Sequence, residues 1–509
     1  MRSCQRVFLL VILALPVFHA QAAAQAIDSA AVDALVQDAM KSWQVPGAAV
    51  AIVRGDEVVY LKGFGVREAG SDKSVTPETL FAIASTTKAF TTTAIAMLVA
   101  DGKMSWDDPV SKHVDFFHLA DPLADHSVTL RDLVTHRTGL SRNDLLWYGS
   151  PLDREEIIRR IGRVKLSQPF RSTYQYQNIM FLTAGYAIGR ASKSSWELFV
   201  QKRIFGPLGM SGANFSSTAA AKAADHSSPH NKGNGGKVAV IPWRNIDNVG
   251  PAGSINAGVS DLGKWLRFQL GDGTFEGKRL LPAVLLRETH TPQMVIPLDG
   301  PSGVSAFTRD MNPDTTMMSY GLGWVIQDYR GQLLVSHGGS IDGFRSQVAL
   351  LPKAKVGVAI LSNLGRTQMP EALRNSLADL VLGLPKKDWN AYLAAQAEKV
   401  EVTQKAREKA RDAKRHPDTK PSRELAAYTG AYEEPAYGQA SISLENDTLV
   451  VQWSSFKIRL EHFHFDTFTA RGDPLIDKQQ IVFSLGADGE VEKLRFLEQE
   501  FKKVKPKAR

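Results

Sequence analysis

The chain is almost devoid of cysteine. Its 509 residues include a single cysteine, Cys4, close to the N-terminus. Disulfide bonds, thiol catalysis and a cysteine-ligated zinc site all need cysteine in the folded protein, and we expect Cys4 to be removed with an N-terminal signal. The sequence therefore excludes these three kinds of chemistry. A chain of this length forms a core large enough to be stable without disulfides.

Long hydrophobic runs are also lacking. Residues 7–18 form the one sustained apolar stretch, and it is too short to span a bilayer comfortably. Arg2 and Arg6 precede it, and small residues with A-x-A spacing follow it over residues 20–26. This arrangement is typical of a cleaved secretory signal over residues 1–26, and an uncleaved anchor is the alternative. We expect a periplasmic or secreted protein with no integral membrane segment after cleavage.

The charge balance argues for no particular partner. The 61 lysine and arginine residues outnumber the 53 aspartate and glutamate residues, which gives a formal net charge of +8. Much of the excess lies in residues 405–420 and 502–509, without the interleaved aromatic side chains of a nucleic-acid-binding surface. We interpret these segments as a solvated linker and tail and predict no nucleic-acid partner. Contact with anionic envelope polymers is the alternative.

Patterns that hold metals are scarce. No H-E-x-x-H motif occurs. His462 and His464 share one face of an expected strand, but no third ligand is evident, so packing is the preferred interpretation. We predict no metal and no cofactor.

Strand-like sequence opens and closes the longer part of the chain. Residues 48–64 are typical of a hairpin, and strand signals return at residues 333–336, 345–351 and 355–363. Helical and loop sequence lies between them. We therefore predict an α/β domain over residues 27–390, in which one antiparallel sheet is built from both ends of the segment and a helical subdomain is inserted.

The composition changes near residue 391. Lysine, arginine, glutamate and alanine dominate up to residue 414 and prolines follow, so we expect a charged helix and a linker over residues 391–422. Short alternating runs then appear, separated by turn sequences such as Asp488-Gly489. They predict a small antiparallel β domain over residues 423–509, either a sandwich or a barrel.

The central motif is Ser85-Thr86-Thr87-Lys88. A helix is expected from about Ser85 to Ala100, and residues i and i+3 share a helix face. Ser85 would lie at the helix N-terminus, where the dipole and free N–H groups favour developing negative charge. A serine hydroxyl needs a base to become a nucleophile, and a lysine serves when burial or neighbouring charge lowers its pKa.

An S-x-x-K pair is weak evidence alone, because a chain with this many serines contains such pairs by chance. A second pair, Ser454 and Lys457, lies in strand-like sequence, where positions i and i+3 point to opposite faces. We discard the second pair. The assignment of Ser85 and Lys88 therefore depends on the surrounding segments.

Seven segments occur in a consistent order over about residues 30–385. They are LFAIASTTK at 80–88, LVTHRTGL at 133–140, YQYQN at 174–178, IFGPLGM at 204–210, PAGS at 251–254, YGLGW at 320–324 and HGGS at 337–340. Together they resemble the penicillin-recognising serine hydrolases, especially the class C β-lactamase and D-aminopeptidase branch. Several short motifs in order are much more specific than any one motif. The resemblance implies a β-lactamase/transpeptidase-like fold, an antiparallel sheet flanked by helices.

The resemblance also implies roles for individual residues. Ser85 aligns with the family nucleophile, Lys88 with its base partner and Tyr176 with the tyrosine that passes a proton to the leaving group. A phenol suits this role if a cation such as Lys88 lowers its pKa, and we expect that here. Asn178 would orient Lys88 and the substrate amide. The backbone N–H groups of Ser85 and Ser340 would form the oxyanion hole.

The third family motif departs from its usual form. Where the family has K-T-G, this chain has His337-Gly338-Gly339, and His337, Gly339 and Ser340 are expected at the substrate site. A lysine there holds a substrate carboxylate as a fixed cation, whereas histidine is only partly charged near neutral pH. The change argues against an efficient β-lactamase. A strand histidine packed on a helix is the alternative for His337, and His136 is expected to be structural.

The C-terminal segment carries a second resemblance. The runs LAAYTGAY at 425–432 and LEHFHFDTF at 460–468 resemble the lipocalin-like domains appended to some of these hydrolases. The resemblance implies that this domain gates substrate access or mediates homo-oligomer formation.

The resemblance implies a serine hydrolase that forms an acyl-enzyme at Ser85. Small peptides or amides, including those with D-residues, are the favoured substrates, and carboxylic esters or slowly hydrolysed β-lactams are the alternatives. A rival from another class is a non-catalytic homologue that binds peptidoglycan. Such a homologue is expected to have lost Ser85, Lys88 or Tyr176, and all three are present.

Overall fold

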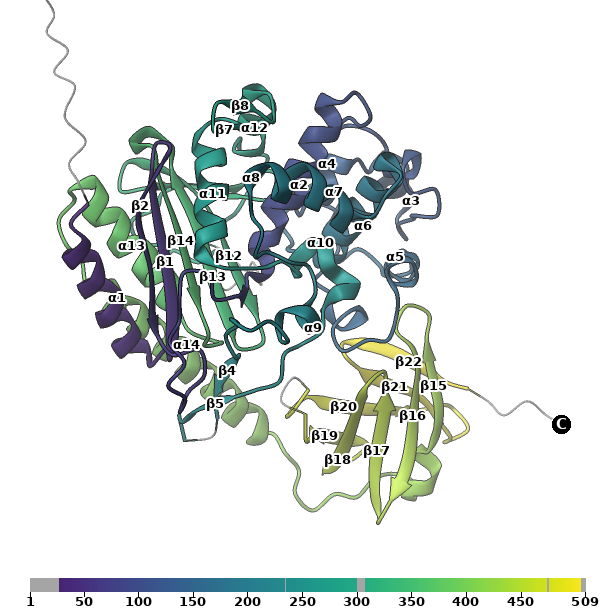
Figure 1. Ribbon diagram of the computed structural model, residues 1–509. Helices are drawn as coiled ribbons and strands as arrows, with labels where there is room; N and C mark the ends of the chain where they lie inside the picture. Colours follow the sequence, from purple (N-terminus) through teal and green to yellow (C-terminus); the bar gives the residue numbers. More distant parts are fainter. Residues whose placement is uncertain (1–26, 234, 300–306, 474–475, 505–509) are drawn as a thin grey trace, which may run out of the picture.

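The computed structural model describes residues 27–233, 235–299, 307–473 and 476–504. A sheet with helices on both faces occupies one side of the molecule, a helical region lies beside it, and a small β-barrel follows at the C-terminal end (Figure 1). The expected signal segment over residues 1–26 lies outside the described residues. Among the helices that the structure describes, none is both long enough and apolar enough to cross a bilayer.

The main sheet is built from both ends of the longer segment, as predicted. Its strands follow the order β2-β1-β14-β13-β12-β11-β10-β9 and pair antiparallel throughout. The N-terminal β1 pairs with β14 in a register that places Ala48 opposite Ser362. The strands are β1 (Gly47–Arg54), β2 (Glu57–Gly65), β9 (Met294–Val295), β10 (Met318–Tyr320), β11 (Val325–Tyr329), β12 (Gln332–Ile341), β13 (Phe344–Leu351) and β14 (Val356–Ser362).

Helices cover both faces of this sheet. The outer face carries α1 (Ser29–Trp43), α13 (Met369–Leu382) and the start of α14 (Trp389–Asp412), as Figure 1 shows. Their buried side chains, such as Val36 and Leu373, pack with alternate residues of β1 and β14. The inner face carries α11 (Val259–Leu270), which contacts β1 and β14. Burial on two faces explains why β1 and β14 are apolar along almost their whole length.

The helical region lies between β2 and β9 in the sequence. Its central helices α2 and α6 pack against each other and against α10. The helices are α2 (Thr87–Ala100), α3 (Pro122–Ser127), α4 (Leu130–Leu133), α5 (Arg154–Ile161), α6 (Asn178–Ser192), α7 (Trp196–Val200), α8 (Gly206–Leu208), α9 (Ser217–Ala220), α10 (Gly250–Gly253) and α12 (Ala283–Thr289). Short strand pairs join its loops, namely β3 (Phe81–Ala82) with β6 (Asn256–Ala257), β4 (His230–Lys232) with β5 (Val238–Val240), and β7 (Thr274–Phe275) with β8 (Lys278–Arg279).

The C-terminal domain is a closed barrel of eight strands, in which β15 pairs with β22. The sequence left a sandwich and a barrel open, and β15, β19 and β22 were not anticipated because their runs are short. The strands are β15 (Gly430–Glu434), β16 (Gly438–Glu445), β17 (Thr448–Trp453), β18 (Phe456–His464), β19 (Thr467–Arg471), β20 (Gln480–Leu485), β21 (Val491–Phe496) and β22 (Gln499–Lys503). Buried aromatic side chains fill its interior, among them Tyr432, Trp453 and Phe483. The β-lactamase-like α/β fold and the lipocalin-like all-β domain are both confirmed.

Candidate active site

Ser85 lies in a short 3-10 turn, η1 (Ala84–Thr86), which leads directly into α2. The regular helix therefore begins at Thr87, two residues later than the sequence indicated. Ala84 has φ of 47°, a left-handed conformation that is uncommon for a residue with a side chain. The turn is held from below by Ser346, whose hydroxyl donates to the carbonyl of Ile83 over 2.7 Å. This backbone brings Ser85 to the wall of a cavity of about 400 Å³.

Lys88 lies one helical turn after Ser85 and is completely buried. Its Nζ is 3.0 Å from Ser85 Oγ, 2.8 Å from Asn178 Oδ1 and 2.8 Å from the carbonyl oxygen of Ala252. Burial lowers the pKa of Lys88 well below its usual value, and the Arg142 guanidinium lowers it further. Nζ is placed as the donor to all three oxygens, and a neutral amine at the same position can accept the Ser85 hydroxyl proton while it donates to the other two.

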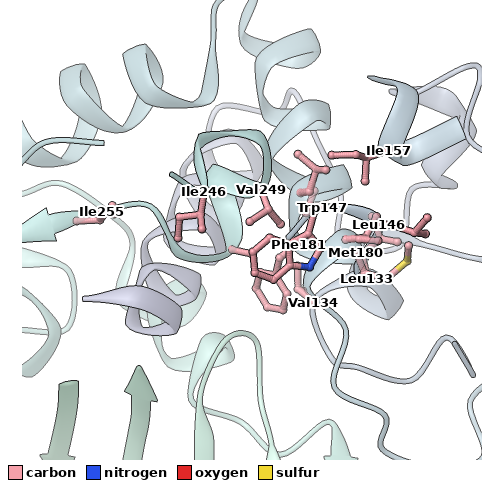
Figure 2. Close-up of a cluster of buried hydrophobic side chains, with 14 of the residues drawn as sticks. Leu133, Val134, Leu146, Trp147, Ile157, Met180, Phe181, Ile246, Val249 and Ile255 are labelled. Atoms are coloured by element: carbon pink, nitrogen blue, oxygen red, sulfur yellow. The ribbon is translucent and has the colours of Figure 1, made fainter. Parts of the chain in front are cut away.

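An apolar cluster provides the burial. Phe181 of α6 lies with its ring centre 5.3 Å from Lys88 Nζ. Figure 2 shows Phe181 among other buried side chains of the helical region, with Trp147, Val134, Ile246 and Val249 close by. A charged ammonium in these surroundings loses most of its hydration, whereas a neutral amine does not carry that cost.

Tyr176 lies on the other side of Ser85. Its phenol O–H donates to Ser85 Oγ over 2.7 Å, and its ring centre is 4.8 Å from Lys88 Nζ. Burial raises the pKa of Tyr176 to about 12, against smaller lowering effects from the Arg142 charge and the Ser85 hydrogen bond. The expectation that Lys88 lowers this pKa is wrong, because burial dominates and a neutral Lys88 exerts no charge. Tyr176 is therefore a proton donor in the resting site.

A charged loop braces these groups, and the sequence analysis missed it. Asp144 Oδ1 accepts hydrogen bonds from Asn178 Nδ2 and from Trp147 Nε1, both over 2.9 Å. Asp144 Oδ2 accepts from Arg142 Nε over 2.7 Å, and the Arg142 guanidinium lies 4.8 Å above the Tyr176 ring. Asn178 thus bridges Lys88 and Asp144. Arg142 and Asp144 directly follow the LVTHRTGL segment, and only this position in the chain could have drawn attention to them.

The strand β12 forms the opposite wall. Ser340 lines the cavity, whereas Gly339 is buried beneath it. A Cβ at Gly339 would lie 2.1 Å from the carbonyl oxygen of Ile83, so only glycine allows β12 to approach the Ser85 turn this closely. The structure thus brings Ser85, Lys88, Tyr176, Asn178 and Ser340 together at one site.

His337 does not line this cavity. It is buried, and this burial lowers its pKa to about 3. Its Nδ1 donates to the carbonyl of Gly338 and its Nε2 accepts from the phenol of Tyr320, both over 2.8 Å. Both ring nitrogens of the neutral imidazole are therefore used within the protein. The packing interpretation fits His337, and a substrate contact does not.

His136 is likewise buried, and its pKa is well below the usual value because of that burial. Its Nδ1 accepts a hydrogen bond from the backbone N–H of Gln177 over 3.0 Å, and its ring stacks near Tyr176 with centres 4.3 Å apart. These contacts position the Tyr174–Asn178 segment. Within the part of the chain that the structure covers, no cluster of histidine, cysteine and acidic side chains is arranged to hold a metal.

The barrel lies beside the catalytic cavity. Gln479, directly before β20, lines that cavity, together with Arg142, Asp144 and Leu145. The same four residues also border an outer cleft of about 1380 Å³ between the helical region and the barrel. A ligand that reaches Ser85 from this cleft therefore passes the barrel.

Comparison with known proteins finds relatives that match most of this chain. An unguisins hydrolase from Aspergillus campestris is 30% identical over 434 residues, which cover 80% of this chain and 76% of the relative. Protein flp from Staphylococcus aureus is 23% identical over 354 residues, covering 69% of this chain and 66% of that protein. The curated relatives thus extend beyond the matched region.

Solved structures share the fold. The octameric penicillin-binding protein homologue from Pyrococcus abyssi matches with a TM-score of 0.60 at 22% identity, covering 94% of this chain and all of that one. The D-amino acid amidase from Ochrobactrum anthropi matches with a TM-score of 0.56 at 21% identity, covering 70% and 97%. The family model described as Beta-lactamase matches residues 32–383, and a domain of unknown function, DUF3471, matches residues 414–506. The chain therefore belongs to the Beta-lactamase family and is a serine hydrolase of that family.

Proposed function

We propose that the protein hydrolyses small peptides or amides, including those with D-residues, through an acyl-enzyme at Ser85. One observation carries the proposal. Ser85 Oγ lies within 3.0 Å of the Lys88 amine and 2.7 Å of the Tyr176 phenol, and these two groups have opposite protonation preferences. A base and an acid on one serine hydroxyl are what acyl transfer to and from that hydroxyl requires.

The proposed acylation step begins with a proton transfer from Ser85 to Lys88. The Ser85 proton moves to the neutral amine of Lys88 while Ser85 Oγ forms a bond to the substrate carbonyl carbon. The negative charge on the carbonyl oxygen is stabilised by the backbone N–H groups of Ser85 and Ser340. Tyr176 then gives its proton to the leaving nitrogen as the C–N bond breaks, and the Lys88 ammonium returns a proton to the Tyr176 phenolate.

Deacylation uses the same groups in the reverse sense. A water molecule loses a proton to Lys88 and attacks the ester carbonyl of the acyl-enzyme. The C–O bond to Ser85 breaks, and Ser85 Oγ takes up the proton that the Lys88 ammonium releases. Asn178 keeps the Lys88 amine aligned throughout, because its own amide is fixed by Asp144.

Substrate class is supported by the relatives. Solved structures of similar fold include a D-stereospecific amidohydrolase from Streptomyces and a D-amino acid amidase. The uncharged, buried His337 argues against the fixed cation that an efficient β-lactamase needs at this position. Carboxylic esters and weakly hydrolysed β-lactams remain the alternative substrates on the same mechanism, and a non-catalytic peptidoglycan-binding homologue is the rival.

The expected signal segment supports a periplasmic or secreted location. For the barrel we propose gating of the cavity or assembly into a homo-oligomer. The gating role is supported by Gln479 at the cavity wall. The assembly role is supported by the similar penicillin-binding protein homologue from Pyrococcus abyssi, which is octameric. Removal of residues 423–509 is expected to change substrate range or assembly state, as measured by the substrate panel below and by light scattering.

A covalent fluorophosphonate probe tests the mechanism. We expect labelling of Ser85, none in Ser85→Ala, and much slower labelling in Lys88→Ala. A panel of D-amino acid amides, D-Ala-D-Ala peptides, p-nitrophenyl esters and nitrocefin then tests the substrate class. Labelling that persists in Ser85→Ala contradicts the proposed nucleophile. An unlabelled wild type that still binds peptidoglycan supports the non-catalytic rival.

A further inference from the structure

The cavity around Ser85 is lined by one charged side chain that no described residue neutralises. Its charged lining residues are Arg142, Asp144, Asp342 and Arg366. Arg142 and Asp144 pair with each other over 2.7 Å. Asp342 accepts a hydrogen bond from the phenol of Tyr148 and lies 3.7 Å from the Arg244 guanidinium. Among the described residues, Arg366 has neither an ion pair nor a hydrogen-bond partner for its guanidinium.

Arg366 is held at the cavity wall by the backbone. It lies in the connection between β14 and α13, is exposed, and has φ of 54°, a left-handed conformation. The preceding Gly365 is buried, and a Cβ there would lie 3.1 Å from the backbone nitrogen of Gly343 in the β12–β13 turn. The base of the Arg366 side chain is therefore fixed to the same wall as Ser340.

A neutral donor accompanies this cation. Asn231 also lines the cavity, and its Oδ1 would lie 2.2 Å from a Cβ at Gly365. Its side-chain amide has no hydrogen-bond partner among the described residues. The N–H groups of an amide and a guanidinium on one wall make a pair of donors that suits the two oxygens of a carboxylate.

His337 occupies the position where the family has a lysine, but it supplies no positive charge here. His337 is buried and neutral, and its ring nitrogens bond Gly338 and Tyr320. The catalytic Lys88 is buried and in contact with Asn178 and Ala252. Of the two arginines that line this cavity, Arg142 is paired with Asp144, so the positive charge that no described carboxylate neutralises is that of Arg366.

We propose that Arg366 and Asn231 form a carboxylate-binding subsite of the catalytic cavity. Its ligand is a carboxylate on the same substrate whose carbonyl reacts at Ser85, for example the free C-terminus of a short peptide. The inference rests on the proposed hydrolase function and narrows its substrates to anionic ones. A planar guanidinium favours this group because its parallel N–H donors match both carboxylate oxygens.

A pair of substrates that differ in one group tests the subsite. N-acyl-D-Ala-D-Ala as the free acid is compared with its C-terminal amide, and p-nitrophenyl acetate reports the basal activity. We expect wild type to prefer the acid through a lower KM. In Arg366→Gln the preference falls by about tenfold, the effect of one charged hydrogen-bonded contact in a partly open site. Turnover of p-nitrophenyl acetate, which has no carboxylate, is measured alongside to separate the acid preference from any general change in activity.

A conservative variant and a control variant complete the test. Arg366→Lys retains the positive charge without the parallel N–H donors of a guanidinium, and it is expected to keep part of the preference for the acid over the amide. Arg190→Gln changes an exposed arginine of a separate surface groove and serves as the matched control. Equal hydrolysis of acid and amide by wild type, or an equal effect of Arg366→Gln on both substrates, overturns the subsite while the hydrolase function stands. Absence of Ser85 labelling overturns the function instead.

Discussion

Tyr437 of the barrel donates its phenol O–H over 3.0 Å to Asn143 Oδ1 in the catalytic loop, the charged loop of residues 141–149. Asn143 lies between Arg142 and Asp144, the two residues that brace Tyr176 and Asn178, and it has φ of 48°. The contact crosses from one domain to the other. It therefore ties the position of the C-terminal barrel to the geometry around the reacting serine.

Further contacts anchor the same loop. The hydroxyls of Ser454 and Ser455, in the turn between β17 and β18, both donate to the carbonyl of Gly149. A Cβ at Gly149 would lie 2.9 Å from the Phe456 ring. Arg163 donates to the carbonyl of Pro435 over 2.8 Å. The barrel thus contacts the helical region on both sides of the Asn143 bond.

Replacement of Tyr437 by phenylalanine removes this single bond and keeps the ring. Because the loop then holds Arg142 and Asp144 less firmly, we expect kcat to fall by roughly fivefold, equivalent to about 1 kcal/mol for one hydrogen bond. KM for small esters is expected to stay near the wild-type value. Steady-state kinetics with a p-nitrophenyl ester measures both constants.

The control is Tyr432→Phe. Tyr432 donates to the carbonyl of Tyr428 inside the barrel, and among the described residues it has no hydrogen bond to the catalytic loop. This variant is expected to lower the melting temperature without changing kcat. If both variants reduce kcat alike, the Tyr437 bond has no special role in positioning the loop.

Removal of the Arg142 charge and removal of the Asp144 charge should shift the acid limb of the pH–activity profile in opposite directions. Lys88 acts as a base only when neutral, so activity falls on the acid side as pH drops through its pKa. Arg142 lowers the pKa of Lys88 and Asp144 raises it. Arg142→Gln is therefore expected to shift the acid limb of kcat/KM to higher pH, and Asp144→Asn to shift it to lower pH.

The comparison depends on the pH at which kcat/KM falls on the acid side, so a general loss of activity in either variant does not obscure it. The buried His136 and His337 lie close to Lys88, but their lowered pKa values keep them neutral above mildly acidic pH. The alkaline side should stay flat well past neutrality, because the pKa of Tyr176 is raised to about 12. Shifts in the same direction in both variants contradict the assignment of the acid limb to Lys88.

The sequence predicted the parts of the site that depend on local spacing. Ser85 and Lys88 are one helical turn apart, and alternating runs predicted most of the barrel strands. The bond between Lys88 and the Ala252 carbonyl joins residues 164 positions apart, and no local pattern encodes it. The pKa of Tyr176 was predicted with the wrong sign, because residue type reveals a nearby cation but not the extent of burial.

Removal of the Tyr176 hydroxyl should affect substrates according to their leaving groups. In Tyr176→Phe the leaving nitrogen of an amide finds no proton, whereas p-nitrophenolate departs as a stable anion. We expect kcat/KM for an amide to fall about 100-fold or more, within the usual range for loss of a general acid, and that for a p-nitrophenyl ester to fall far less. Parallel losses on both substrates indicate that Tyr176 acts on Ser85 alone.

The two glycines of the HGG segment should tolerate substitution very differently. A Cβ at Gly339 would lie 2.1 Å from the Ile83 carbonyl and 2.2 Å from Ser346 Oγ, both held in the turn beneath Ser85. A Cβ at Gly338 would meet the side-chain end of Gln347 at 2.9 Å, and such an end can rotate away. Gly339→Ala must therefore push β12 away from the turn that carries Ser85, which separates Ser340 from Ser85.

We expect Gly339→Ala to be destabilised by about 1–3 kcal/mol, the usual cost of overpacking a core, and to lose most fluorophosphonate labelling. Gly338→Ala should stay close to wild type in melting temperature and labelling. Because both variants add one methyl group to the same strand, equal behaviour means that the close approach of β12 is not what sets the distance between the two proposed oxyanion donors.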